Sequence, residues 1–82
     1  MNKSAKEMFE ELGYEVNENE WNLTYSKDII LNQFYTSPIT INFRKFNDKV
    51  IEKYDFNGKS VPIFMYELKA INKQIEELGW NK

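Results

Sequence analysis

The stretch Ile39-Thr40-Ile41-Asn42-Phe43 decides the fold class, because apolar and polar residues alternate along it. Successive side chains of a β-strand point to opposite faces of a sheet, so this alternation predicts a strand with one buried and one solvated face. Similar alternation continues on both sides, and turn residues interrupt it at regular spacing. The pattern predicts five short strands, near 21–26, 29–35, 39–46, 49–56 and 59–64.

Four pairs of turn residues would join these strands into an antiparallel meander. Asn57-Gly58 is the strongest signal, since both residues tolerate the positive φ of a type I′ turn. Asn47-Asp48, Ser37-Pro38 and Lys27-Asp28 are weaker. Taken as two-residue turns, all four agree in register and gather the large apolar side chains on one face. The predicted inner face holds Trp21, Leu23, Tyr25, Ile30, Phe34, Ile39, Ile41, Phe43, Val50, Tyr54, Phe56, Val61 and Ile63.

Helical patterns stand at both ends of the chain. Ser4 and Glu7 have the spacing of a capping box, and apolar residues at helical spacing follow, which predicts a helix over about 5–12. A second run of apolar residues at steps of three and four predicts a helix over about 65–78. Gly13-Tyr14 and Gly79-Trp80 follow the two runs and are typical of Schellman caps.

These elements predict one α+β domain over residues 1–82, in the order α-β-β-β-β-β-α. The antiparallel meander would have four to five strands, with both helices packed on one face. A chain of 82 residues has a thin core, and 16% aromatic residues help to fill it.

Composition removes most catalytic chemistry from consideration. The chain has no histidine and no cysteine, so imidazole bases, thiolate nucleophiles and the usual zinc ligands are absent. The three glycines are explained by caps and a turn, which leaves no glycine-rich phosphate loop. We therefore expect no enzyme activity, no catalytic residues, no cofactor and no metal. Apolar runs are too short to span a bilayer, and we expect a cytoplasmic protein.

The net charge of −2 is unevenly distributed. Residues 1–20 carry two cations and six acids, net −4; residues 21–59 carry six cations and four acids, net +2; residues 60–82 balance. Nucleic-acid-binding domains are usually net basic, so this distribution weakens that function without excluding it.

The outward face of the predicted sheet carries an unexpected apolar patch. Its apolar members are Ile29, Leu31, Tyr35, Phe46 and Ile51, and its rim is formed by Arg44, Lys49 and Lys53. The predicted partner-binding residues are these five apolar residues with Arg44 and Lys53. Contiguous apolar surface with a polar rim is typical of interaction sites. The alternative is that one or two strands are misregistered, or that a loop or terminus covers the patch.

Two segments carry a resemblance to known proteins. These segments are Lys6-Glu7-Met8-Phe9-Glu10-Glu11-Leu12-Gly13-Tyr14 and Glu67-Leu68-Lys69-Ala70-Ile71-Asn72-Lys73-Gln74-Ile75-Glu76-Glu77-Leu78-Gly79-Trp80, with a β-rich middle between them. Together they resemble small uncharacterised proteins of phages and prophages of low-GC Gram-positive bacteria. The resemblance implies an accessory protein in the cytoplasm of an infected host. It carries no site residues.

The predicted function is therefore non-catalytic binding of a host or phage protein, or of a second copy of the chain, and the resemblance implies inhibition of a host defence system as one form of this function. The alternative is a small single-stranded nucleic-acid-binding protein. In that case Tyr35 and Phe46 would stack on bases, while Arg44 and Lys53 would contact phosphates.

Overall fold

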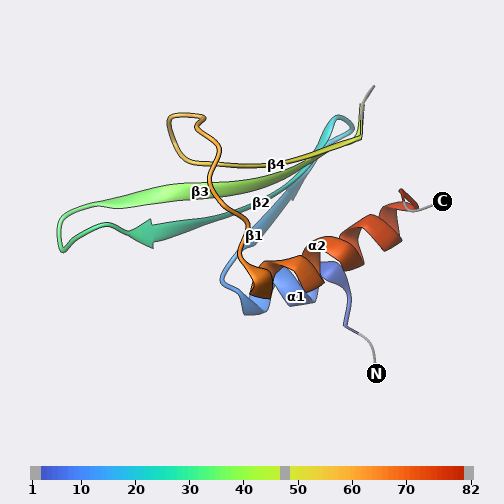
Figure 1. The fold of residues 1–82 in the computed structure, drawn as a ribbon, viewed down its shortest axis with the longest axis horizontal. Coiled ribbons are helices and arrows are strands. Elements are labelled where there is room, and N and C mark those ends of the chain that lie inside the picture. Colours follow the sequence, from blue (N-terminus) through green and yellow to red (C-terminus); the bar gives the residue numbers. More distant parts are fainter. Residues whose placement is uncertain (1–2, 47–48, 81–82) are drawn as a thin grey trace.

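A computed structural model describes residues 3–46 and 49–80 of the chain. Within these residues, two helices bracket a four-stranded antiparallel sheet of order β1-β2-β3-β4 (Figure 1). The elements in chain order are α1 Ala5–Glu11, β1 Glu15–Glu18, β2 Asn22–Ile30, β3 Thr36–Arg44, β4 Val50–Tyr54 and α2 Met65–Leu78. The predicted α+β meander of four to five strands is confirmed, and it has four strands in the described residues.

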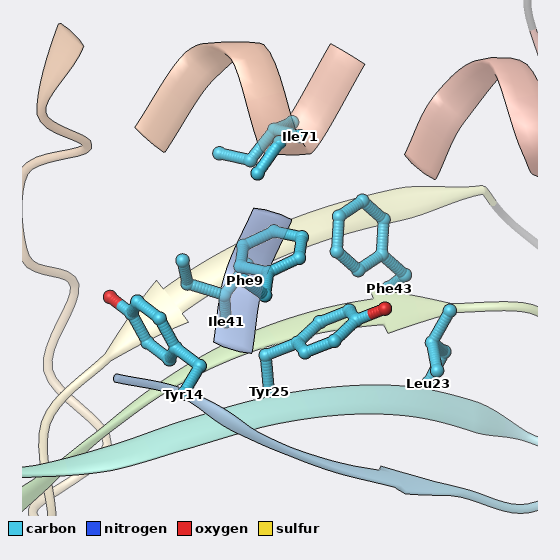
Figure 2. Close-up of a cluster of buried hydrophobic side chains, with 8 residues drawn as sticks. Phe9, Tyr14, Leu23, Tyr25, Ile41, Phe43 and Ile71 are labelled. Atoms are coloured by element: carbon cyan, nitrogen blue, oxygen red, sulfur yellow. The ribbon is translucent and has the colours of Figure 1, made fainter. Parts of the chain in front are cut away.

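Both helices cover the same face of the sheet, and the core lies between the two layers (Figures 1 and 2). Phe9 of α1 stands at its centre and is fully buried. Its ring stacks on Tyr25 at 3.9 Å between centroids and meets Tyr14 edge-on at 5.6 Å. Ile41 and Phe43 of β3 complete the sheet side of the core, so aromatic rings supply much of its buried area.

The helix ends form as the sequence predicts. Ser4 Oγ accepts the N–H of Glu7, and the Glu7 carboxylate accepts the N–H of Ser4, which completes the capping box. After α1, the N–H groups of Gly13 and Tyr14 donate to Glu10 and Phe9 in a Schellman arrangement. Gly79 and Trp80 repeat it after α2, so the matching ends of the two helices are structural.

Several of the predicted turns and strands are wrong in this structure. The residues Lys27-Asp28 and Ser37-Pro38 lie inside β2 and β3, so the predicted strands 21–26 and 29–35 are one strand followed by a loop. The chain does turn at Asn57-Gly58, but the residues after it form a single bridge, from Ser60 to Tyr54, and not a strand over 59–64.

Strand β1 is absent from the sequence prediction. Val16 is the one apolar residue among its four, so the segment has no alternation to signal a strand. It pairs with β2 from Glu15 opposite Ser26 to Glu18 opposite Leu23.

The register between β3 and β4 differs by one residue from the predicted one. Ile41 faces Lys53 instead of Tyr54, and the last pair before the connection is Arg44 with Val50. The connection therefore spans residues 45–49; the predicted turn residues Asn47-Asp48 themselves lie outside the described residues. A shift of one residue exchanges the faces of a strand, which is why β4 presents the side chains opposite to those expected.

The predicted inner face is correct in the middle of the sheet and wrong toward its ends. Leu23, Tyr25, Ile39, Ile41 and Phe43 are buried, as predicted. Val50 and Tyr54 lie on the outward face because of the register shift of β4, and both are half-buried, as is Val61. The exposed residues that were assigned to the core are Trp21, Ile30, Phe34, Phe56 and Ile63.

Candidate functional site

The structure separates the seven predicted partner-binding residues into three places. Ile29, Leu31 and Tyr35 lie where β2 turns into β3. Arg44 and Phe46 lie at the opposite end of β3. Since β3 has nine residues at about 3.3 Å each, its two ends are roughly 30 Å apart. The predicted patch is therefore not one surface.

The β4 members of the patch are on the wrong side of the sheet for the predicted role. Ile51 packs against the hydrophobic core, and Lys53 is only 7% exposed. Both corrections follow from the one-residue register shift. At the far end, Phe46 packs edge-on against Trp21 at 4.4 Å, and Arg44 forms an ion pair with Glu52. Of the four residues predicted to contact nucleic acid, Arg44 and Phe46 lie at the same end of the sheet, whereas Tyr35 lies at the other end and Lys53 is buried.

The outward face of the sheet is polar at its centre. Asn42 Nδ2 donates to Asn22 Oδ1 at 2.9 Å, and Asn42 Oδ1 accepts the Thr24 hydroxyl at 3.1 Å. This network and the Arg44–Glu52 pair extend across β2, β3 and β4. The outward sheet face is therefore polar at its centre, where Asn42 is buried in this hydrogen-bond network, and is not the apolar platform that the sequence predicted.

Exposed apolar surface lies instead on a hairpin arm, which we define as residues 27–39. Among the described strands, β1 pairs with β2 only up to Ser26, and β4 pairs with β3 only down to Thr40. The arm continues beyond them as a two-stranded ribbon and projects past the helices (Figure 1). It contributes to an elongated shape with extents of 44 × 33 × 22 Å.

The end of this arm, called here the apolar tip, exposes five large side chains. Ile30 is 81% exposed and Phe34 77%; the other members are Ile29, Leu31 and Tyr35. Side chains alternate along β2, so Ile29 lies on the same face as the helix-covered residue Tyr25, and Ile30 lies on the opposite face. Apolar groups are therefore present on both sides of the ribbon. From Ile29 to Ser37 the sequence has no charged residue.

Asn32 organises the loop at the tip. Its Oδ1 accepts the N–H groups of Phe34 at 2.8 Å and Tyr35 at 3.1 Å. The N–H of Leu31 donates to the carbonyl of Tyr35 at 3.0 Å and closes the loop. Asx turns of this kind hold a short loop in one conformation, so the apolar side chains are presented in a defined arrangement.

A second feature is a buried ionic cluster beneath β4. Lys53 Nζ lies 2.8 Å from Glu67 Oε1, with 4% and 1% of the two side chains exposed. Tyr14 donates its hydroxyl proton to Glu67 Oε2, and the N–H of Phe64 donates to Oε1 at 2.9 Å. Lys53 also donates to the carbonyl of Pro62 at 2.8 Å. The cluster therefore ties α2 and the segment before it to β4 and to the end of α1.

The titration of this cluster follows from its contacts. Burial acts to raise the pKa of Glu67, but hydrogen bonds from Lys53, Tyr14 and Phe64 outweigh it and hold that pKa below its ordinary value. Burial and the neighbouring Glu67 carboxylate raise the pKa of Tyr14. Within the described residues every buried side-chain nitrogen and oxygen has a hydrogen-bond partner. The cluster is therefore a fully hydrogen-bonded structural ion pair, in which Lys53 neutralises the charge of Glu67.

A groove lies between the two helices. Its apolar floor includes Met8, Leu12 and Ala70. The acids on its rim are paired, Glu11 with Lys3 and Glu76 with Lys73. In residues 3–46 and 49–80 there is no group of three or more acidic residues that could hold a metal ion, and no helix long and apolar enough to cross a membrane.

Comparison with family models, curated proteins and solved structures finds no match to this chain.

Sequence reasoning missed Ile30 and Phe34 as surface residues and placed them in the core. One signal was present: Ile29-Ile30-Leu31 is a run of three apolar residues that breaks the strict alternation of a strand with one buried face. The polar pair Asn32-Gln33 that follows marks the loop.

Proposed function

We propose that this chain is a non-catalytic binding protein that inserts the apolar tip of its hairpin arm into an apolar cleft of a partner protein. The observation that carries the proposal is the exposure of five large apolar side chains at the end of a projecting ribbon. A projecting element requires a concave partner, and apolar side chains on both sides of the ribbon favour a cleft over a flat surface.

The size of the apolar tip supports this proposal. With about 200 Å² for a fully exposed large side chain, the exposed fractions leave roughly 600 Å² accessible. The largest apolar patch on a typical monomer is about 300–600 Å² and is often functional, so the tip lies at the upper end of that range. A standard interface buries about 800 Å² on each partner, so the tip and a polar rim would suffice.

The nature of the surface indicates the kind of partner. A cleft that accepts nine residues without charge has to be apolar itself, since burying an unpaired charge opposite them would be costly. The resemblance to phage and prophage proteins would make the partner a host or phage protein, and a component of a host defence system is one such target.

Substitution at the tip tests the proposal. Phe34→Glu should weaken binding of a purified partner by about 30-fold or more, as expected when a central interface side chain is lost. Phe56→Glu is the matched control, because Phe56 is also an exposed phenylalanine, at 64% against 77% for Phe34, and lies outside the arm. Affinity per binding site would be measured by calorimetric titration.

The partner would be identified by capture from host lysate with the wild-type chain, and then tested with both variants. Equal affinity of Phe34→Glu and the wild type would refute the arm as the binding site. Far-ultraviolet circular dichroism of both variants would verify that the fold is retained.

A further inference from the structure

A second exposed apolar surface lies where α2 begins. We call it the α2-entry surface and define it by four consecutive residues. Met65 is 79% exposed, and the other members, Ile63, Phe64 and Tyr66, are between 42% and 55% exposed. The rings of Phe64 and Tyr66 stack at 5.4 Å with an angle of 6°. The apolar tip does not include any of these residues.

The buried ionic cluster holds this surface in place. Glu67 accepts the N–H of Phe64, and Lys53 Nζ lies 4.4 Å from the centre of the Phe64 ring. Lys53 also fixes the carbonyl of Pro62, immediately before the surface. Removing one partner of such a buried pair is strongly destabilising, so the cluster holds the start of α2 firmly. A surface fixed before binding loses less conformational entropy when it binds.

The accessible area of the α2-entry surface is close to the apolar area that one partner buries in a homodimer interface of standard size. At about 200 Å² for each fully exposed large side chain, the four residues leave roughly 450 Å² accessible. A homodimer interface of standard size buries about 800 Å² per partner, of which about 65%, or roughly 500 Å², is apolar. The α2-entry surface can therefore supply nearly all the apolar area of a two-fold interface.

The charge of the surface is also compatible with self-association. In a two-fold dimer the same patch faces itself, so any exposed charge near the axis meets a like charge. Residues 63–66 carry no charge, and Glu67 is buried and paired with Lys53, so the exposed charge nearest in sequence is Lys69, one turn of α2 beyond Met65. Two stacked aromatic rings and a methionine are also the side chains that are enriched at interface centres.

We propose that two copies of this chain form a two-fold dimer through the α2-entry surface. The arm is a separate part of the structure and projects past the helices (Figure 1), so the dimer would present two apolar tips. A partner with two clefts, or two partner molecules, could then be bound at once, with the second contact strengthened by the first. The dimer does not depend on the proposed function of the arm.

The oligomeric state of the full chain tests the dimer. Interfaces of standard size have dissociation constants from micromolar downward, so the wild type at about 100 µM should have twice the mass of 9.9 kDa by light scattering. Met65→Glu places like charges across the axis and should raise the dissociation constant at least about 30-fold. The substitution is at the first residue of α2, where an acidic side chain favours the helix, so the monomer should stay folded.

Opposite charges at the same position give a more specific test. Met65→Glu and Met65→Lys should each be monomeric, whereas an equimolar mixture should form a mixed dimer, because the two charges then attract. Phe34→Glu is the matched control, and it should remain dimeric even if it no longer binds a partner. A monomeric wild type, or a Phe34→Glu variant that loses the dimer while Met65→Glu retains it, would overturn the proposal.

Discussion

The buried pair of Lys53 and Glu67 yields the strongest prediction about stability. Lys53→Met would remove the cation and leave the Glu67 carboxylate buried, still bonded to Tyr14 and to the N–H of Phe64. Loss of one partner from a buried pair costs about 3–5 kcal/mol, because the remaining charge stays uncompensated. The carbonyl of Pro62 also loses its donor. A domain of 82 residues has a free energy of unfolding of about 4–12 kcal/mol, so the loss is a large share of it.

Two further variants make the reasoning specific. Lys53→Met combined with Glu67→Gln removes both charges but keeps an oxygen that can accept from Tyr14, and should recover about 1–3 kcal/mol relative to Lys53→Met alone. Lys45→Met is the matched control, since Lys45 pairs with the exposed Glu18 at 2.7 Å. An exposed pair is worth at most about 1 kcal/mol, so this variant should lose little stability.

Urea unfolding followed by far-ultraviolet circular dichroism would give the free energy of each variant. Tryptophan fluorescence provides a second probe, because Trp80 packs near Phe43 with ring centroids 6.2 Å apart. If Lys53→Met loses no more stability than Lys45→Met, or if the second substitution recovers nothing, the pair is solvated and the reasoning is wrong.

Two predictions concern pH. The pKa of Glu67 is lowered below its ordinary 4.5 on folding, so its contribution to stability is present above pH 4.5 and is lost as pH falls through the lower, folded value. Urea unfolding in acid should therefore show the difference between wild type and Glu67→Gln shrinking; a constant difference would contradict this. Burial and the charge of Glu77 raise the pKa of Tyr25 from 10.0 to about 12, so its contribution is present below pH 10 and is lost as pH rises toward 12. Tyr25→Phe should be less stable at neutral pH, because Gln74 loses its hydrogen bond, and should lose less stability above pH 10 than wild type does. Parallel alkaline curves for the two proteins would refute that assignment.

Local signals predicted the helices and the centre of the sheet correctly. The Ser4–Glu7 capping box and the Gly-aromatic ends are interactions within a few residues, so the sequence suffices to predict them. The alternation through Ile39, Ile41 and Phe43 is likewise local, and the structure buries all three side chains. The same reasoning failed at the connections. Residues 31–35, which join β2 to β3, lie in a predicted strand, and the connection between Arg44 and Val50 is longer than the predicted two-residue turn.

The error in register led the sequence analysis to the wrong candidate site. Because the register of β4 differs by one residue from the predicted one, Ile51 and Lys53 lie on the core side of the sheet and not on the solvent side. Lys53 is therefore part of a buried cluster with Glu67 and Tyr14. The three residues of this cluster lie on β4, α2 and the segment after α1, and their spacing in sequence gives no sign that they meet. The predicted patch is therefore not one surface in the structure, although three of its members, Ile29, Leu31 and Tyr35, are exposed together.

By itself, the sequence determined the class of the fold, the two helices with their caps, and the inner face of the middle strands, because periodicity and capping act over a few residues. Only the tertiary structure decided that the β2–β3 hairpin extends beyond its neighbours as an arm and that Lys53 is buried. Those features depend on strand lengths and on the pairing of distant residues, which no local pattern encodes.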